Sequence, residues 1–169
     1  MTSFRRILVP HDFSPPAEEA LALAARLIPA DGRLLVLHVI VPFVPVTDLP
    51  VGPGGYIAPQ EFVGDTKRQL DRAVAKTMRG KPTRRIETKV VVGDPYQRIV
   101  AAARGMDAIV MSTAGRTGLS HLLIGSVAEK VVRHSPIPVL TLRHEVTRRR
   151  AKPSTTALRP LVARRTSVG

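Results

Sequence analysis

Five short apolar runs alternate with four helical patterns along this chain, and this alternation limits the fold more than any other feature. The runs are rich in Val, Ile and Leu and have strand length, whereas the segments between them repeat apolar residues at helical spacing. The pattern predicts strands over 6–10, 33–40, 85–92, 108–112 and 139–142 and helices over 17–28, 60–79, 96–104 and 126–134. We therefore predict an α/β fold, a five-stranded parallel and doubly wound sheet with helices on both faces.

Composition favours a cytoplasmic protein with one globular domain. The 169 residues include no cysteine, and no run approaches the ~18 apolar residues of a membrane span. The first residues contain no apolar segment of signal-peptide length, which is the basis for expecting a cytoplasmic location. The net charge is +13, and residues 144–169 hold seven Lys or Arg against one acid. We predict a globular domain over 1–143 and a disordered basic tail over 144–169.

Two segments outside the strand–helix pattern have open roles. Residues 41–59 contain five prolines and three glycines, and we expect a long loop that forms a wall or lid of the site. The tail is either a solubilising extension or a non-specific contact for an anionic partner, such as nucleic acid or lipid. Aromatic residues make up only 4%, and the sequence contains no recognised nucleic-acid-binding module. Sequence-specific nucleic-acid binding is therefore disfavoured.

The segment from 108 to 127 predicts a site for an anion. Its strand leads into small, hydroxylated and glycine residues, and these end where the helix 126–134 begins. The free N–H groups and the dipole at a helix start favour a phosphate, and Gly115 and Gly125 let the backbone approach it. A simpler interpretation makes both glycines turn residues. Arg116 is either a phosphate ligand or a solvated side chain.

Polar residues after the first strand extend this candidate site. His11 and Asp12 follow the strand 6–10, and the carboxyl ends of parallel strands meet at one edge of a sheet. Asp12 either accepts hydrogen bonds from a ligand or caps the turn behind it. His38 is expected in the core, and His11 is undecided. The sequence lacks a Walker P-loop, a metal-ligand spacing and a nucleophile elbow.

Four sequence motifs stand out: Arg6-Ile7-Leu8-Val9-Pro10-His11-Asp12-Phe13-Ser14, Leu37-His38-Val39, Val92-Gly93-Asp94-Pro95 and Gly125-Ser126-Val127-Ala128-Glu129-Lys130. Together these motifs resemble the universal stress protein (UspA) family, and the resemblance covers residues 3–143. It implies a Rossmann-like sheet with strand order 3-2-1-4-5. It also implies a homodimer that pairs through the last strand, with Val139, Leu140, Thr141 and Leu142 at the interface.

The resemblance is to the ATP-binding branch of that family, whose motif is Gly, two residues, Gly, nine residues, then Gly-Ser or Gly-Thr. Gly115, the nine residues after it and Gly125-Ser126 match, whereas Ser112 replaces the first glycine and Ala114 stands where histidine is common. The resemblance implies ATP or another adenine nucleotide, accompanied by Mg²⁺ or Mn²⁺. The implied site residues are Pro10, His11, Asp12, Val39, Met111, Ser112, Ala114, Gly115, Arg116, Gly125, Ser126 and Val127.

The function implied by the resemblance is a nucleotide-binding module in stress response or signalling, with little or no turnover. No recognisable nucleophile or general base accompanies the phosphate loop. Two alternatives stay open. One is a slow ATPase or a nucleotidyl-transfer enzyme, and the other is a stress protein that binds no ATP and acts through dimerisation and partner contacts.

Overall fold

A five-stranded parallel sheet forms the centre of the molecule. The computed structural model describes residues 4–42, 59–80, 85–113 and 124–143. The strand order is β3-β2-β1-β4-β5, and every neighbouring pair is parallel. The strands are β1 (Arg6–Pro10), β2 (Arg33–Ile40), β3 (Arg85–Val92), β4 (Ala108–Ser112) and β5 (Val139–Leu142). The predicted fold class and strand order are confirmed.

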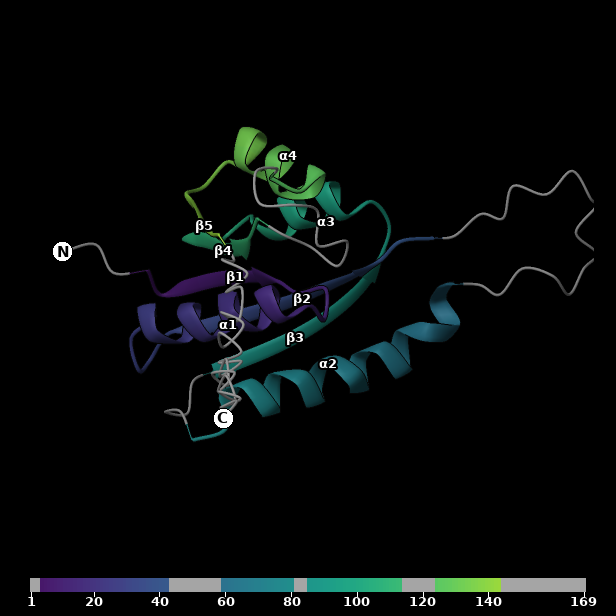
Figure 1. Ribbon diagram of the computed structural model, residues 1–169, viewed down its shortest axis with the longest axis horizontal. Coiled ribbons are helices and arrows are strands. Elements are labelled where there is room, and N and C mark those ends of the chain that lie inside the picture. The colour runs from purple at the N-terminus through teal and green to yellow at the C-terminus, as the bar shows by residue number, and fades with distance from the viewer. Residues whose placement is uncertain (1–3, 43–58, 81–84, 114–123, 144–169) are drawn as a thin grey trace, which may run out of the picture.

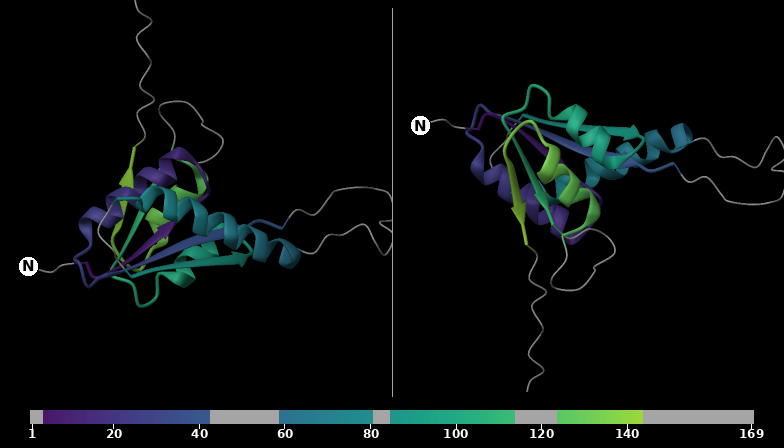
Figure 2. Two further views of the ribbon diagram at one scale, coloured as in Figure 1. Left: turned by 90° about the horizontal axis from the view of Figure 1, so that it is seen from below. Right: turned by 90° about the horizontal axis from the view of Figure 1, so that it is seen from above.

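Helices cover both faces of this sheet. Figure 1 shows α1 and α2 along one face and α3 and α4 along the other, and the two views of Figure 2 show each pair in front in turn. The helices are α1 (Pro15–Leu27), η1 (Pro59–Phe62, a 3₁₀ turn), α2 (Val63–Met78), α3 (Pro95–Ala102) and α4 (Ser126–His134). Within the described ranges, no helix has the length and apolar character needed to cross a membrane.

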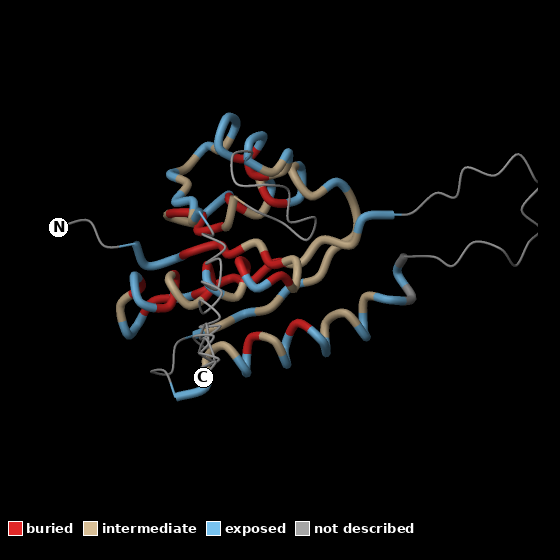
Figure 3. Tube along the Cα trace, viewed as in Figure 1, coloured by how far each residue is buried: buried red, intermediate tan, exposed pale blue. Residues whose placement is uncertain are grey.

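The central strand β1 lies in the middle of the core. Ile7, Leu8 and Val9 are each 0% exposed, and the buried residues concentrate around this strand in Figure 3. Because successive side chains alternate between faces, Ile7 and Val9 pack beneath α1 and α2, whereas Leu8 packs beneath α3 and α4. Burial of an aliphatic side chain contributes about 1.5–3 kcal/mol, so this short strand is a principal source of stability.

The start of β1 is held to β4 by one carboxylate. Asp107 Oδ2 accepts hydrogen bonds from the backbone N–H groups of Arg5 (2.9 Å) and Arg6 (2.8 Å). Its other oxygen accepts from the Arg6 guanidinium at 2.8 Å. The hydrogen bond from the Arg6 side chain is the main reason why the pKa of Asp107 is lowered. Asp107 therefore fixes β1 beside β4 at the edge opposite the predicted site.

Helix boundaries differ from the predicted ones at three starts. The helix predicted over 60–79 begins as the 3₁₀ turn η1 and becomes α-helical at Val63, and the first and third helices begin at prolines, Pro15 and Pro95. Side chains set both of these starts: Ser14 Oγ accepts from the Ala17 N–H, and Asp94 Oδ1 accepts from the Gln97 N–H.

The helical spacing of apolar residues over 60–79 predicts that Phe62 lies, with Leu70 and Val74, on the apolar stripe of the second helix. The prediction is wrong for Phe62. The side chain is 47% exposed, because it belongs to η1 and so stands outside the 3.6-residue period of α2. Leu70 and Val74 of the same predicted stripe are buried against the sheet.

We predict opposite effects for alanine at two glycines. A Cβ at Gly32 would lie 2.3 Å from Cγ1 of the buried Ile28, whereas a Cβ at Gly64, within α2, would meet only the Arg68 guanidinium at 3.8 Å. Gly32→Ala should lower the free energy of unfolding by about 1–3 kcal/mol. Gly64→Ala should raise it by about 0.5–1 kcal/mol, because alanine loses less conformational entropy in a helix. Urea denaturation measures both, and a Gly32→Ala variant as stable as the wild type would contradict this description of the core.

Candidate functional site

The candidate site lies at the carboxyl edge of the sheet, where the strand order reverses. From β1 the chain proceeds to β2 and β3 on one side, whereas β4 and β5 lie on the other side. Crevices at such a reversal are the usual ligand sites of doubly wound sheets. The structure brings nine of the twelve predicted residues to this edge: Pro10, His11, Asp12, Val39, Met111, Ser112, Gly125, Ser126 and Val127. Ala114, Gly115 and Arg116 lie outside the described residues, as do 43–58 of the predicted loop and the tail 144–169.

Asp12 organises the turn between β1 and α1. Its Oδ1 accepts hydrogen bonds from the Ser14 backbone N–H at 3.0 Å and from the Ser14 hydroxyl. The Ser14 hydroxyl oxygen in turn accepts from the Ala17 N–H at 3.3 Å, which caps α1. Of the two roles that the sequence left open for Asp12, the structure shows the capping role. The ligand role stays a prediction.

Phe13 has a left-handed backbone, with φ of +66°, and it is the one non-glycine residue with a positive φ in the described part of the chain. A large side chain in this conformation costs about 1–3 kcal/mol unless its surroundings stabilise it. The Phe13 N–H donates to His11 Nδ1 at 3.2 Å, and its ring centroid lies 4.5 Å from that of His38. This conformation of Phe13 cannot be predicted from the sequence, because no glycine or asparagine marks the position.

His11 is buried, and both of its backbone polar groups are hydrogen-bonded. The residue is 3% exposed. Its backbone N–H donates to the Leu37 carbonyl at 2.8 Å, and its backbone carbonyl accepts from His38 Nδ1 at 2.7 Å. Because Nδ1 accepts from Phe13, the neutral ring carries its proton on Nε2, for which the structure shows no hydrogen-bond partner. Burial lowers the pKa of His11. These contacts make His11 a positioning residue for the turn that carries Asp12.

The junction between β4 and α4 is closed by backbone hydrogen bonds. The Thr113 N–H donates to the Leu142 carbonyl at 2.9 Å, and the Gly125 N–H donates to the Thr113 carbonyl at 2.7 Å. A Cβ on Gly125 would lie 3.2 Å from that same carbonyl oxygen. Thr113 and Gly125 are therefore held in contact, and a small residue is needed at position 125.

The start of α4 differs from the starts of α1 and α3. Side-chain oxygens cap α1 and α3, whereas Gly125 supplies no side-chain hydrogen bond to α4. The first N–H groups of a helix have no intrahelical acceptor, and the dipole there is positive. The backbone at Ser126 and Val127 thus offers donors beside the end of β4.

An apolar wall lies on the α3–α4 side of this edge. Val39 and Val127 are partly buried against one core cluster that includes the buried Met111. Met111 can offer a ligand only its backbone, whereas the two valines keep some exposed surface. Across the described residues, no three His, Asp or Glu side chains are grouped so as to hold a metal ion.

Comparison with known proteins gives consistent relatives. A model of the universal stress protein family matches residues 3–143. A universal stress protein from Thermus aquaticus is 36% identical over 148 residues, which cover 83% of this chain and 99% of that relative. One from Methanocaldococcus jannaschii is 31% identical over 157 residues, which cover 84% of this chain and 96% of the relative. Its solved structure superposes with a TM-score of 0.63 and 27% identity, over 85% of this chain and 99% of that one.

A solved structure with a bound nucleotide has the same fold. It is a universal stress protein family member from Arabidopsis thaliana with AMP bound, and it matches with a TM-score of 0.54. The match covers 88% of this chain and 97% of that one, and the identity is 19%. A likeness at this identity concerns the fold alone.

We predict that His11 makes the stability depend on pH. In the unfolded chain its pKa returns to about 6.5, so below that pH the unfolded state binds more protons than the folded state. The free energy of unfolding should therefore fall as the pH drops from about 6.5 through the lowered pKa of the folded state. His11→Asn does not titrate, and its amide oxygen can replace Nδ1 as the acceptor for the Phe13 N–H.

Thermal and urea unfolding from about pH 7.5 to about pH 5 tests this prediction. The slope should flatten in His11→Asn and persist in the control His134→Asn, which changes an exposed histidine of α4. Equal slopes in all three proteins would show that His11 is not buried as a neutral group.

Proposed function

This chain belongs to the universal stress protein family, and we propose that it binds an adenine nucleotide, preferentially ATP, at the carboxyl ends of β1, β2 and β4. The observation that carries the proposal is the start of α4, which lacks a side-chain cap and lies beside the end of β4. This position adjoins the point where the strand order reverses. A phosphate there would meet the free N–H groups of the first helical turn and the positive end of the helix dipole.

The phosphate groups would contact the start of α4. Gly125 permits close approach, the exposed Ser126 offers a hydroxyl, and the Val127 N–H lies in the first turn of the helix. The sequence motif adds Ser112 and the residues Ala114, Gly115 and Arg116. The match of Gly115 and Gly125-Ser126 to the family motif supports this half of the site.

The nucleoside would lie between the ends of β1 and β2. Asp12 is the acceptor proposed for the ribose hydroxyls, and its position is fixed by the hydrogen bonds with Ser14. Pro10, His11 and Val39 complete this half, with His11 acting through the turn it positions. The match of Gly115 and Gly125-Ser126 to the motif of the ATP-binding branch is the reason for proposing an adenine ligand.

Mg²⁺ or Mn²⁺ would accompany a triphosphate and neutralise part of its charge. Magnesium commonly binds to substrate phosphates with only one or two protein carboxylates, so the absence of a three-ligand cluster among the described residues is compatible with such an ion. We propose binding with little or no turnover, in a module that responds to nucleotide levels during stress or signalling.

The proposal includes a homodimer that forms through β5. This strand is at an edge of the sheet, and Leu140 is 44% exposed on it. An uncovered strand edge with an apolar side chain favours pairing with a second copy.

The central prediction concerns Asp12. Asp12→Asn keeps an oxygen that accepts from the Ser14 N–H but weakens hydrogen bonds from ribose hydroxyls, so the Kd for Mg-ATP should rise about 10-fold. The matched control is Asp94→Asn, which changes a helix-capping carboxylate at the end of β3 that our proposal places outside the site. Calorimetric titration measures both affinities.

Three results would contradict parts of this proposal. A wild-type protein that binds neither ATP nor AMP at millimolar concentration would support the alternative of a stress protein without nucleotide. Steady release of ADP or AMP during long incubation would show turnover. An equal loss in Asp12→Asn and Asp94→Asn would indicate a general effect of removing a carboxylate.

The dimer prediction concerns Leu140. Leu140→Glu places a charge on the exposed edge strand, so the sedimentation coefficient should shift from that of a dimer to that of a monomer. Val132→Glu changes an exposed apolar residue of α4 and should leave the assembly unchanged. A dimer that persists in Leu140→Glu would exclude β5 as the contact.

A further inference from the structure

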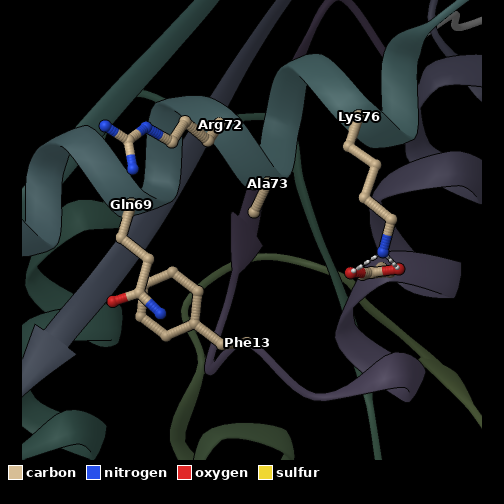
Figure 4. A pocket seen from close by; sticks show the side chains of 6 residues that line it. Phe13, Gln69, Arg72, Ala73 and Lys76 are labelled. Carbon is tan, nitrogen blue, oxygen red and sulfur yellow. Dashed lines mark hydrogen bonds and ion pairs between the residues drawn. The ribbon is translucent and has the colours of Figure 1, made fainter.

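A cavity of about 290 Å³ lies between α1 and α2, on the sheet face opposite α3 and α4. This volume is close to the lower end of ordinary small-molecule sites and leaves room for one or two rings. Figure 4 shows Phe13 and Gln69 together at one end, Lys76 at the other, and Ala73 between them. The cavity exists because α2 presents the short side chain of Ala73 at this point, where a longer residue would fill the space.

The charges around the cavity favour an anion. Its lining includes two cations, Arg72 and Lys76, and one carboxylate, Glu18. Lys76 already lies 3.3 Å from a Glu18 oxygen, whereas Arg72 makes no ion pair with any residue that the structure describes. A guanidinium binds a carboxylate through two parallel hydrogen bonds. Arg72 is therefore the available anion-binding group beside an apolar surface.

Phe13 connects this cavity to the turn after β1. Its ring lines the cavity and also packs against two histidine rings. The ring centroid of Phe13 lies 4.5 Å from that of His38 and 5.6 Å from that of His11. Its backbone has the left-handed φ of +66°, and its neighbours Asp12 and Ser14 are joined by hydrogen bonds. A group that packs on the Phe13 ring would therefore change the conformation of the turn between β1 and α1, because only a small number of contacts stabilise that turn.

We propose that this α1–α2 cavity is a second binding site, which takes a small aromatic carboxylate. The carboxylate pairs with Arg72, and the ring lies over Phe13 and Ala73. Occupation alters the turn at Asp12 through Phe13. The binding step does not depend on the proposed nucleotide site, because none of the six lining residues belongs to that site.

The test is a titration of the full chain with 2-naphthoate, followed by two-dimensional amide NMR. Saturable shifts should appear at the lining residues of α1 and α2 and at the amides of Asp12, Phe13 and Ser14. Acetate supplies only the anion and 2-naphthalenemethanol only the ring system, so each should bind at least 10-fold more weakly than 2-naphthoate.

Two variants with matched controls locate the site. Arg72→Gln should weaken binding at least 10-fold, and Arg104→Gln, an exposed arginine after α3, should not. Ala73→Leu should fill the cavity and abolish binding, whereas Ala75→Leu, on the exposed face of α2, should bind as the wild type does. Leucine is a good helix former, so both variants should fold.

Three outcomes would overturn the inference. The first is the absence of saturable shifts up to millimolar 2-naphthoate, and the second is unchanged binding by both Arg72→Gln and Ala73→Leu. The third is a set of shifts confined to Ser126 and Val127, which would place the carboxylate at the start of α4. That last result would support the proposed anion site there while excluding the α1–α2 cavity, so the two proposals fail separately.

Discussion

The burial of β1 on both faces and along both edges is the constraint on which the rest of the structure depends. Its backbone pairs with β2 on one side and β4 on the other, and three consecutive side chains are completely buried. The carboxyl end of β1 lies between those of β2 and β4, at the point where the strand order reverses. The chain that leaves β1 therefore enters the crevice where doubly wound sheets place their ligands. The site follows from the topology before any particular side chain is considered.

The turn after β1 shows how the protein maintains an unfavourable local conformation. Phe13 adopts a left-handed backbone, which a residue of its size rarely does. Nδ1 of the buried His11 accepts from the Phe13 backbone N–H, and the ring of His38 packs against the Phe13 ring. The hydrogen bond from the Ser14 N–H to Asp12 then stabilises the turn on both sides of Phe13. These contacts connect Phe13 to His11 before it, to the hydrogen-bonded pair of Asp12 and Ser14, and to His38 of β2. Strain of this kind is common at functional sites, where surrounding packing over-determines the conformation.

Helix capping divides the helix starts into two kinds. Ser14 and Asp94 satisfy donors of α1 and α3 from within the chain, so neither start needs an external anion. The α4 start follows a glycine and has no such side-chain cap. The same segment carries the glycine spacing of the family motif, and the backbone hydrogen bond between Gly125 and Thr113 keeps it at the end of β4. Sequence pattern and hydrogen bonding thus both favour the anion site that we propose at the start of α4.

The sequence by itself determined the alternation of strands and helices, because apolar periodicity depends only on which residues must be buried. All five strands occur at their predicted positions, including the short β5. The strand order came from the family resemblance, and periodicity alone could not supply it. Sequence also singled out Asp12, after the first strand, and Gly125, before the last helix, as candidate site residues, and their ligand roles stay predictions. Only the tertiary structure decided that His11 faces the core, that Phe13 is left-handed and that Phe62 is exposed. The first two properties depend on contacts with Leu37 and His38 of β2, which lie far along the chain, and no local pattern encodes such contacts. The exposure of Phe62 depends on where the 3₁₀ turn η1 gives way to α2.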